Sequence, residues 1–244
     1  MRLTRPDSIA AASAALFLGL LPGESMLVLA QGTPIFEADP PKQCPLCDAW
    51  NEPLEPFRIF GDTYYVGTTG LSAVLIASDE GHVLLDGGLP QSAALIDRSI
   101  RALGFSTEDI RLIVNSHAHY DHAGGIAALQ RASGAAVAAS PRGADALERG
   151  EPTRDDPQFA LGREANAFPP VPAVRRIADE MPLNVGGLTI TPVFTPGHTP
   201  GSTTWTWRSC EESRCLSIVY ADSLNPVSAD EYRFTDDPET LMAL

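Results

Sequence analysis

Three histidines and one aspartate fall within six consecutive positions, His117 to His122, directly after an apolar run. Imidazole and carboxylate groups are the ligands of catalytic zinc sites, where one coordination position stays open for water. In an extended segment His117 and His119 project to the same side and can hold one ion, while Asp121 and His122 follow the bend toward a second. The whole chain has five histidines, so this concentration predicts a metal centre rather than a solvated polar loop.

The two remaining histidines have different surroundings. His198 lies in a turn rich in glycine and proline, between two strand-like runs, where a loop residue can point back at the first cluster. We therefore expect His198 to be the third ligand of the ion held by His117 and His119. His82 begins a strand-like run that has no metal ligand beside it, and we expect it to be a half-exposed strand residue.

The amino-terminal residues 1–30 have the pattern of a secretory signal peptide. A basic start precedes an apolar core over residues 9–21, and a small-residue cleavage site follows. The core is too short to span a bilayer, and no later segment is long and apolar enough, so we expect no membrane anchor after cleavage. We expect one domain over residues 31–244, in the periplasm or secreted.

The charge of the chain argues against one class of partner. The formal net charge is −14, with 17 Lys and Arg residues against 31 Asp and Glu residues. Nucleic-acid binding draws on clustered lysine and arginine, which this sequence lacks, so we expect no nucleic-acid partner.

The four cysteines agree with export. Cys210 and Cys215 flank a polar turn between two strand-like runs, which predicts a disulfide that closes a hairpin. For Cys44 and Cys47 two alternatives stay open: a tight local disulfide, or the pairing of one of them elsewhere.

The order of strand-like and helix-like segments predicts the fold class. Short β-branched or aromatic runs come first, at residues 57–60, 63–66, 71–77 and 82–85. A helical pattern then runs from Pro90 to Leu103, and a buried strand at 111–115 leads into the metal motif. Further strand-like runs occupy residues 188–194, 203–207 and 216–220. We therefore expect an α/β fold with two sheets, helices packed outside and ligands on loops at one edge.

Three motifs together resemble the metallo-β-lactamase superfamily. They are the His-x-His-x-Asp-His run, the Pro-Gly-His-Thr-Pro-Gly turn around His198, and Tyr220-Ala221-Asp222-Ser223-Leu224. The export signal and the Asp-Ser-Leu form of the last motif resemble in particular the dizinc β-lactamases of the third subclass. The likeness runs from about Pro56 to Leu244 and implies an αβ/βα sandwich of two sheets.

The resemblance also implies two Zn²⁺ ions and their ligands. His117, His119 and His198 would bind the first zinc, and Asp121 and His122 the second. A metal-bound hydroxide, oriented by Asp121 as the catalytic residue, would open the ring of a small β-lactam substrate. The antibiotic would thereby be destroyed without a covalent enzyme intermediate.

Other residues receive roles from the same resemblance. Ser223, where other subclasses place a cysteine ligand, would hydrogen-bond a water on the second zinc. Asn225, Gln158 and Phe159 fall where related enzymes contact substrate. For Asp86, at a strand end, two roles stay open: it steadies a metal ligand, or it caps the glycine turn that follows.

One departure from the family pattern concerns the second zinc. Complete members continue to a further histidine, its third protein ligand, and then to a closing helix, whereas no histidine follows His198 here. Residues 237–244 have the pattern of a helix cut off in its early turns, which predicts a truncated sequence.

Three functions are compatible with these residues. The first is β-lactam hydrolysis, and the second is another hydrolysis of the same fold, by a glyoxalase II-like thioesterase or a lactonase in which Asp222 bridges both metals. The third is an inactive fragment that binds metal poorly. The export signal and Ser223 favour the first function.

Overall fold

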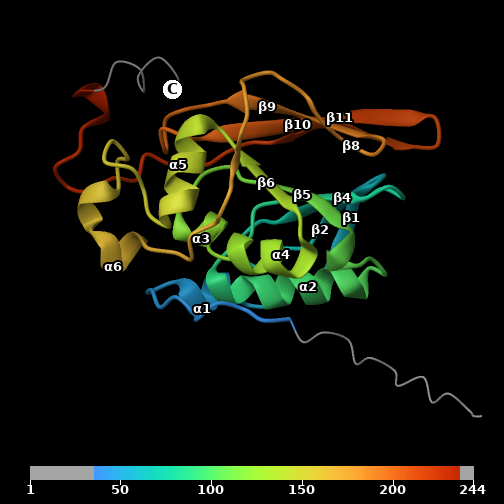
Figure 1. Ribbon diagram of the computed structural model, residues 1–244, viewed down its shortest axis with the longest axis horizontal. Coiled ribbons are helices and arrows are strands. Elements are labelled where there is room, and N and C mark those ends of the chain that lie inside the picture. Colours follow the sequence, from blue (N-terminus) through green and yellow to red (C-terminus); the bar gives the residue numbers. More distant parts are fainter. Residues whose placement is uncertain (1–35, 237–244) are drawn as a thin grey trace, which may run out of the picture. The chain divides into compact units, whose positions relative to one another are not determined.

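Residues 36–236 are described by the computed structural model, and they form two β-sheets with a layer of helices over the first sheet (Figure 1). The predicted signal peptide and the predicted final helix lie outside these residues. Among the described residues, no helix is both long and apolar enough to cross a bilayer. The predicted α/β class with two sheets is confirmed.

The first sheet has seven strands in sequential order. They are β1 (Phe57–Phe60), β2 (Thr63–Tyr65), β3 (Val74–Ile76), β4 (His82–Leu85), β5 (Ile110–Val114), β6 (Ala136–Ala139) and β7 (Arg175–Arg176). Strands β1 to β4 pair antiparallel, and β4 to β7 pair parallel. Parallel neighbours need crossover connections, so helices fall between these strands in the chain.

The second sheet has four antiparallel strands. They are β8 (Leu183–Val185), β9 (Leu188–Phe194), β10 (Thr203–Glu211) and β11 (Arg214–Tyr220), in the spatial order β11-β10-β9-β8. Cys210 pairs with Cys215 in the β10–β11 hairpin, and the predicted disulfide joins them across a Cα–Cα distance of 4.0 Å. The other two cysteines, Cys44 and Cys47, are bonded to each other.

The longer helices begin and end at residues with clear local causes. Helix α2 (Ala93–Ala102) follows a 3₁₀ turn that begins at Pro90. Helices α4 (Ile126–Ser133) and α5 (Pro141–Arg149) end at glycines with φ angles of 69° and 70°, a conformation that costs glycine little. The short helices are α1 (Cys47–Trp50), α3 (Tyr120–Ala123) and α6 (Arg163–Asn166), and 3₁₀ turns cover Thr107–Asp109, Phe159–Leu161 and Phe234–Asp236.

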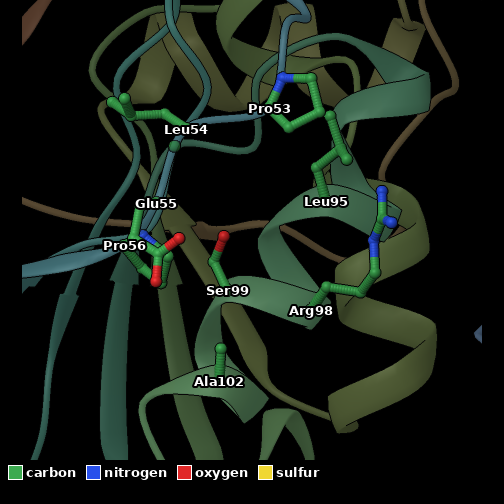
Figure 2. A pocket seen from close by; sticks show the side chains of 9 residues that line it. Pro53, Leu54, Glu55, Pro56, Leu95, Arg98, Ser99 and Ala102 are labelled. Atoms are coloured by element: carbon green, nitrogen blue, oxygen red, sulfur yellow. The ribbon is translucent and has the colours of Figure 1, made fainter.

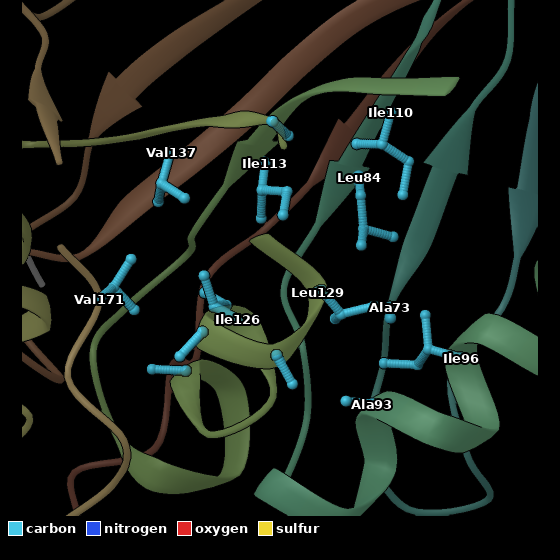
Figure 3. Packing of buried hydrophobic residues seen from close by; sticks show 14 of the residues in the cluster. Ala73, Leu84, Ala93, Ile96, Ile110, Ile113, Ile126, Leu129, Val137 and Val171 are labelled. Carbon is cyan, nitrogen blue, oxygen red and sulfur yellow. The ribbon is translucent and has the colours of Figure 1, made fainter. Parts of the chain in front are cut away.

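The central strands are buried on both faces. In β4, Leu84 packs into the same cluster as Ile96 of α2 and Leu129 of α4 (Figure 3). Its neighbours Val83 and Leu85 belong to a second cluster that includes Trp205 of β10. Successive residues of a strand point to opposite faces, so one layer of strands serves two cores.

Two local predictions were wrong. The strand predicted over residues 71–77 is limited to Val74–Ile76, because the preceding residues form a turn in which Thr68 and Val66 donate to the carbonyls of Leu71 and Ala73. His82 is 5% exposed rather than half-exposed. Its ring packs edge-on against Phe105, a residue distant in the sequence, with a centroid separation of 5.2 Å.

Candidate metal centre

The strand ends bring the predicted ligands together. His117 and His119 follow β5, the short helix α3 carries Asp121 and His122, and His198 comes from the turn between β9 and β10. Two groups result: the three histidines 117, 119 and 198, and the set formed by residues 117, 121 and 122, each with its potential ligand atoms within 4.8 Å of one another. The arrangement contains the donors that a zinc site with nitrogen and oxygen ligands needs.

The ring nitrogens of the first group lie at ligand-like distances. His119 Nδ1 is 3.2 Å from His198 Nε2. Two nitrogens that each bind a tetrahedral zinc at about 2.0–2.1 Å are about 3.3–3.4 Å apart. The pair is therefore spaced as two ligands of one ion.

Two histidines of the first group have their remaining ring nitrogen fixed by an outer partner. His117 Nδ1 lies 2.7 Å from Asp222 Oδ1, and both side chains are buried. His198 Nδ1 lies 2.7 Å from the backbone carbonyl oxygen of Asn225. Metal-binding histidines usually donate their second N–H to such groups, which fixes the tautomer and leaves the other nitrogen for the ion.

The other two histidines follow the same rule. His119 Nε2 lies 3.2 Å from each carboxylate oxygen of Asp156, and His122 Nδ1 lies 2.9 Å from Asp86 Oδ2. Asp156 was not among the predicted site residues, because it stands in an irregular loop far from the motifs. With all four outer nitrogens occupied, the inner ones form a set that fits a metal.

Asp86 is held by a dense set of donors. It is fully buried, and its carboxylate accepts hydrogen bonds from Asn115 Nδ2 at 2.9 Å, from the Ser116 amide at 2.7 Å and from the Tyr220 hydroxyl at 3.0 Å. Its φ angle of 60° is rare outside glycine and costs on the order of 1–3 kcal/mol. Two roles were left open for Asp86, and the contact of its carboxylate with His122 corresponds to the first, in which it steadies a predicted metal ligand.

Burial and charge set the protonation of the ligands. Burial, together with the neighbouring imidazoles, holds the pKa of His117 well below its ordinary value, and burial also lowers the pKa of His198. Burial acts in the same direction on His122, but the hydrogen bond and charge of Asp86 raise its pKa to about 9. For Asp121 burial favours protonation, yet the nearby imidazoles lower its pKa. His117 and His198 are thus held in the neutral form that binds metals.

The residues predicted to contact substrate, and Ser223, which was predicted to hydrogen-bond a water on the second zinc, divide between two hollows. Ser223 and Asn225 line a cavity of about 80 Å³ together with His198. Gln158 Nε2 lies 3.3 Å from His119 Nδ1, so this side chain reaches the centre. Phe159 lines a different cavity, of about 380 Å³, whose wall includes none of the four histidines of the centre.

Another hollow lies away from these residues. Figure 2 shows a cavity of about 330 Å³ between residues 53–56 and helix α2, into which the Ser99 hydroxyl points. Glu55 and Arg98 stand at its sides, and Leu95 and Ala102 are among its apolar lining residues. None of its lining residues belongs to the metal centre, so the chemistry must be sought at the strand ends.

Comparisons with known proteins agree with this geometry. The sequence model of the metallo-β-lactamase superfamily matches residues 66–206. Among solved structures, the Rm3 metallo-β-lactamase is 52% identical with a TM-score of 0.78, and the match covers 82% of this chain and 74% of that one. The subclass B3 enzyme MEM-A1, from a soil metagenome library, is 50% identical with a TM-score of 0.76 over 80% of this chain and 74% of that one.

A third solved relative widens the comparison. The metallo-β-lactamase SMB-1, bound to 2-mercaptoethanesulfonate, is 45% identical with a TM-score of 0.76 over 80% of this chain and 74% of that one. The family model covers more than half of the chain, and the three relatives are 45%, 50% and 52% identical to it over the aligned residues. The resemblance predicted from three motifs is confirmed: the chain belongs to the metallo-β-lactamase superfamily of hydrolases and is similar to its subclass B3 enzymes.

Proposed function

We propose that this chain hydrolyses the ring of β-lactam antibiotics with two zinc ions and thereby confers resistance to them. The observation that carries the proposal is the orientation of four imidazoles, each with its outer nitrogen held by a carboxylate or carbonyl. The similarity to Rm3, MEM-A1 and SMB-1, which are all metallo-β-lactamases, supports the choice of substrate.

The residues that would hold the metals follow from the two groups. His117, His119 and His198 suit the first zinc, and Asp121 with His122 suits the second. Bound zinc supplies Lewis acidity, which polarises a carbonyl and lowers the pKa of water toward neutrality. The protein's own part is to keep the ligands in place before substrate arrives, through the outer contacts made by Asp86, Asp156 and Asp222.

Two polar side chains are placed to act on the reactants. Asp121 belongs to the second group beside His117, and its Oδ2 lies 3.9 Å from His122 Nε2. From this place its carboxylate can orient an attacking water and accept a hydrogen bond from it. Gln158 offers an amide group next to His119, where it can bind a polar group of the substrate.

One contact of Asp222 supports this function over thioester hydrolysis. In the thioesterase alternative Asp222 bridges both metals. Here its Oδ1 lies 2.7 Å from the outer nitrogen of His117, so this oxygen orients a ligand. This contact favours the β-lactamase function.

The cellular location is part of the proposal. We infer that residues 1–30 are removed as a signal peptide and that the mature chain works in the periplasm or is secreted. The two disulfides support this location, because such bonds persist in oxidising compartments. Amino-terminal sequencing of the exported protein tests it, and a mature chain that still begins at Met1 would contradict it.

The function is tested on the purified chain with added zinc. We expect one tightly bound zinc equivalent at His117, His119 and His198 and a second that binds more weakly, because Asp121 and His122 supply fewer ligands to it. We also expect opening of nitrocefin and a carbapenem, loss of turnover with a chelator, and resistance to serine-directed inhibitors. Hydrolysis of S-lactoylglutathione without any lactam turnover would select the thioesterase instead.

A further inference from the structure

Lys42 is the only lysine of the chain, so sixteen of its 17 basic residues are arginines. It lies in the segment of residues 36–46 that precedes helix α1, and it is half-buried. Lysine carries its charge on a compact ammonium with three donors, whereas the guanidinium of arginine is planar and larger. A single lysine among many arginines indicates a position where a compact cation is needed.

The backbone of Lys42 is fixed on both sides. Its amide donates to Gln91 Oε1 at 3.0 Å, and Gln91 Nε2 donates to its carbonyl oxygen at 3.0 Å. Two residues further on, Cys44 is bonded to Cys47, whose side chain is 1% exposed. The side chain of Lys42 therefore extends from an anchored piece of backbone.

The ammonium of Lys42 contacts two separate elements. Its Nζ donates to the backbone oxygen of Glu164 at 2.9 Å and to that of Ala167 at 3.0 Å, at the carboxyl end of helix α6. Carbonyls at this end of a helix have no partner within the helix. The same Nζ lies 4.7 Å from the centre of the Tyr120 ring in helix α3, which is a cation–π distance.

The two carbonyls flank Asn166, which is linked to the metal centre. Asn166 is 3% exposed, and its Nδ2 donates to the backbone oxygen of Gln158 at 2.8 Å. The amide of Gln158 donates to Asp156 Oδ1 at 2.8 Å, and this carboxylate lies behind the ring of His119. Hydrogen bonds within one segment thus join Lys42 to the group that orients a predicted ligand.

The ring contact reaches the other half of the centre. Tyr120 directly precedes Asp121, and both belong to the single turn of α3 that also carries His122. The Tyr120 side chain also packs against the small buried cluster around Leu89. The turn that carries two predicted ligands is therefore held by this cluster and by the ammonium.

We propose that Lys42 is a positioning residue of the metal centre: its ammonium fastens the segment that holds Asp156 behind His119 to helix α3, which carries the ligands of the second zinc. The proposal rests on the metal centre of the proposed function and adds to it a residue that contacts no ligand. Both protein ligands of the second zinc lie on α3, whereas two of the three ligands of the first zinc have outer partners elsewhere. Loss of the ammonium should therefore affect the second zinc more than the first.

The test replaces Lys42 by methionine, which keeps a long side chain but removes the charge and the donors. In chelator competition, Lys42→Met should weaken the second zinc by about two- to five-fold, the range of an exposed cation–π contact, and leave the first unchanged. In the metal-free chain, the amides of Gln158 and Asn166 should exchange with deuterium about ten-fold faster, because hydrogen bonds from a charged donor no longer hold their segment.

Arg131→Met is the matched control. Arg131 donates to the backbone oxygen of Glu37 and pairs with Asp39 at 3.0 Å, so it fastens the same amino-terminal segment to helix α4 instead of to the metal centre. This variant should leave the affinity for the second zinc and the exchange of both amides unchanged. Lys42→Arg guards against a failure of Lys42→Met to fold. It keeps a cation over Tyr120, so it should retain the second zinc, but its planar guanidinium should not restore the slow exchange.

The positioning role requires both changes in Lys42→Met and neither in Arg131→Met. Equal changes in the two variants would show that only the attachment of residues 36–46 matters, and this result would overturn the proposal. Unchanged exchange in Lys42→Met, or in Lys42→Arg if the methionine variant does not fold, would overturn it as well. If the unaltered chain binds zinc but hydrolyses no lactam, the proposed function is overturned, while zinc affinity and amide exchange still decide the role of Lys42.

Discussion

The two ends of the first sheet carry buried histidines with opposite surroundings. At the carboxyl ends of β4 and β5, His117 and His122 each have one ring nitrogen bonded to a buried aspartate. At the amino end of β4, the ring of His82 accepts a hydrogen bond from the amide of Ser78 at 3.3 Å, and its buried Nε2 has no hydrogen-bond partner among residues 36–236. Burial of a histidine is common to both ends, and the carboxylate behind the ring marks the functional one.

The pKa values of His122 and His82 also differ. Asp86 raises the pKa of His122 to about 9 against the effect of burial. For His82 burial prevails and lowers the pKa, although Asp109 acts against it. A contacting aspartate does not by itself raise the pKa, because His117 bonds Asp222 and yet burial and the neighbouring imidazoles hold its pKa well below the ordinary value.

The largest effect is expected from removing a ligand at the carboxyl end. His198→Ala deletes one of three imidazoles of the first group, so the chain should lose one zinc equivalent after dialysis and nearly all hydrolysis of nitrocefin. His82→Gln is the matched control, since it removes a buried histidine from the other end. A His198→Ala protein that retains its full zinc content would show that the first group is assigned wrongly.

A smaller effect is expected from the carboxylate behind a ligand. Asp86→Asn removes the charge that orients His122, and we expect the second zinc to bind about 10–100-fold more weakly in chelator competition. Asp97→Asn is the control, because Asp97 is also buried but bonds Arg101 and Thr107 away from the centre. Equal zinc affinity in the Asp86 variant and the unaltered chain would refute the role of this contact.

A third prediction concerns Tyr220, a residue of the second sheet that contacts Asp86. The Tyr220 hydroxyl donates to Asp86 at 3.0 Å, and burial raises its pKa well above the ordinary value, which keeps it a donor. Tyr220→Phe should weaken the second zinc by several-fold and lower the free energy of unfolding by about 0.5–1.5 kcal/mol. Tyr65→Phe, which loses hydrogen bonds to the carbonyls of Thr68 and Leu71, should lower stability without changing zinc affinity.

The sequence predicts the ligand set because its determinants are local. A buried strand followed by alternating histidines places His117 and His119 on one side, and the glycine-proline turn marks His198 as a loop residue. The contacts behind the ligands depend instead on residues that are distant in the sequence. Asp156 and Tyr220 reach the centre through long-range packing, and neither shows a periodic pattern that separates it from other loop or strand residues.

Contacts that a local sequence pattern does not reveal also explain the errors in the predicted fold. The strand predicted over residues 71–77 begins only at Val74, because its first residues form a hydrogen-bonded turn that a run of apolar residues does not reveal. His82 begins its strand as predicted, but Phe105, beyond helix α2, covers its ring. Elements set by pattern were predictable, whereas burial set by a partner distant in sequence was not.

The smallest expected effect is the dependence of stability on pH that His82 causes. Because burial lowers its pKa in the folded state, the unfolded chain binds a proton more readily once the pH falls below the ordinary histidine value of about 6.5. This part of the stability is present at higher pH and is lost as the pH falls through that range. Desolvation is the largest influence on the ring and outweighs Asp109 and the backbone groups of Ser78 and Gly81, which raise the pKa, while Arg111 adds a small lowering effect, so desolvation governs the sign. In urea unfolding of the metal-free chain, the stability difference between the unaltered protein and His82→Gln should shrink from about pH 8 to about pH 5, and a difference that stays constant over this range would contradict it.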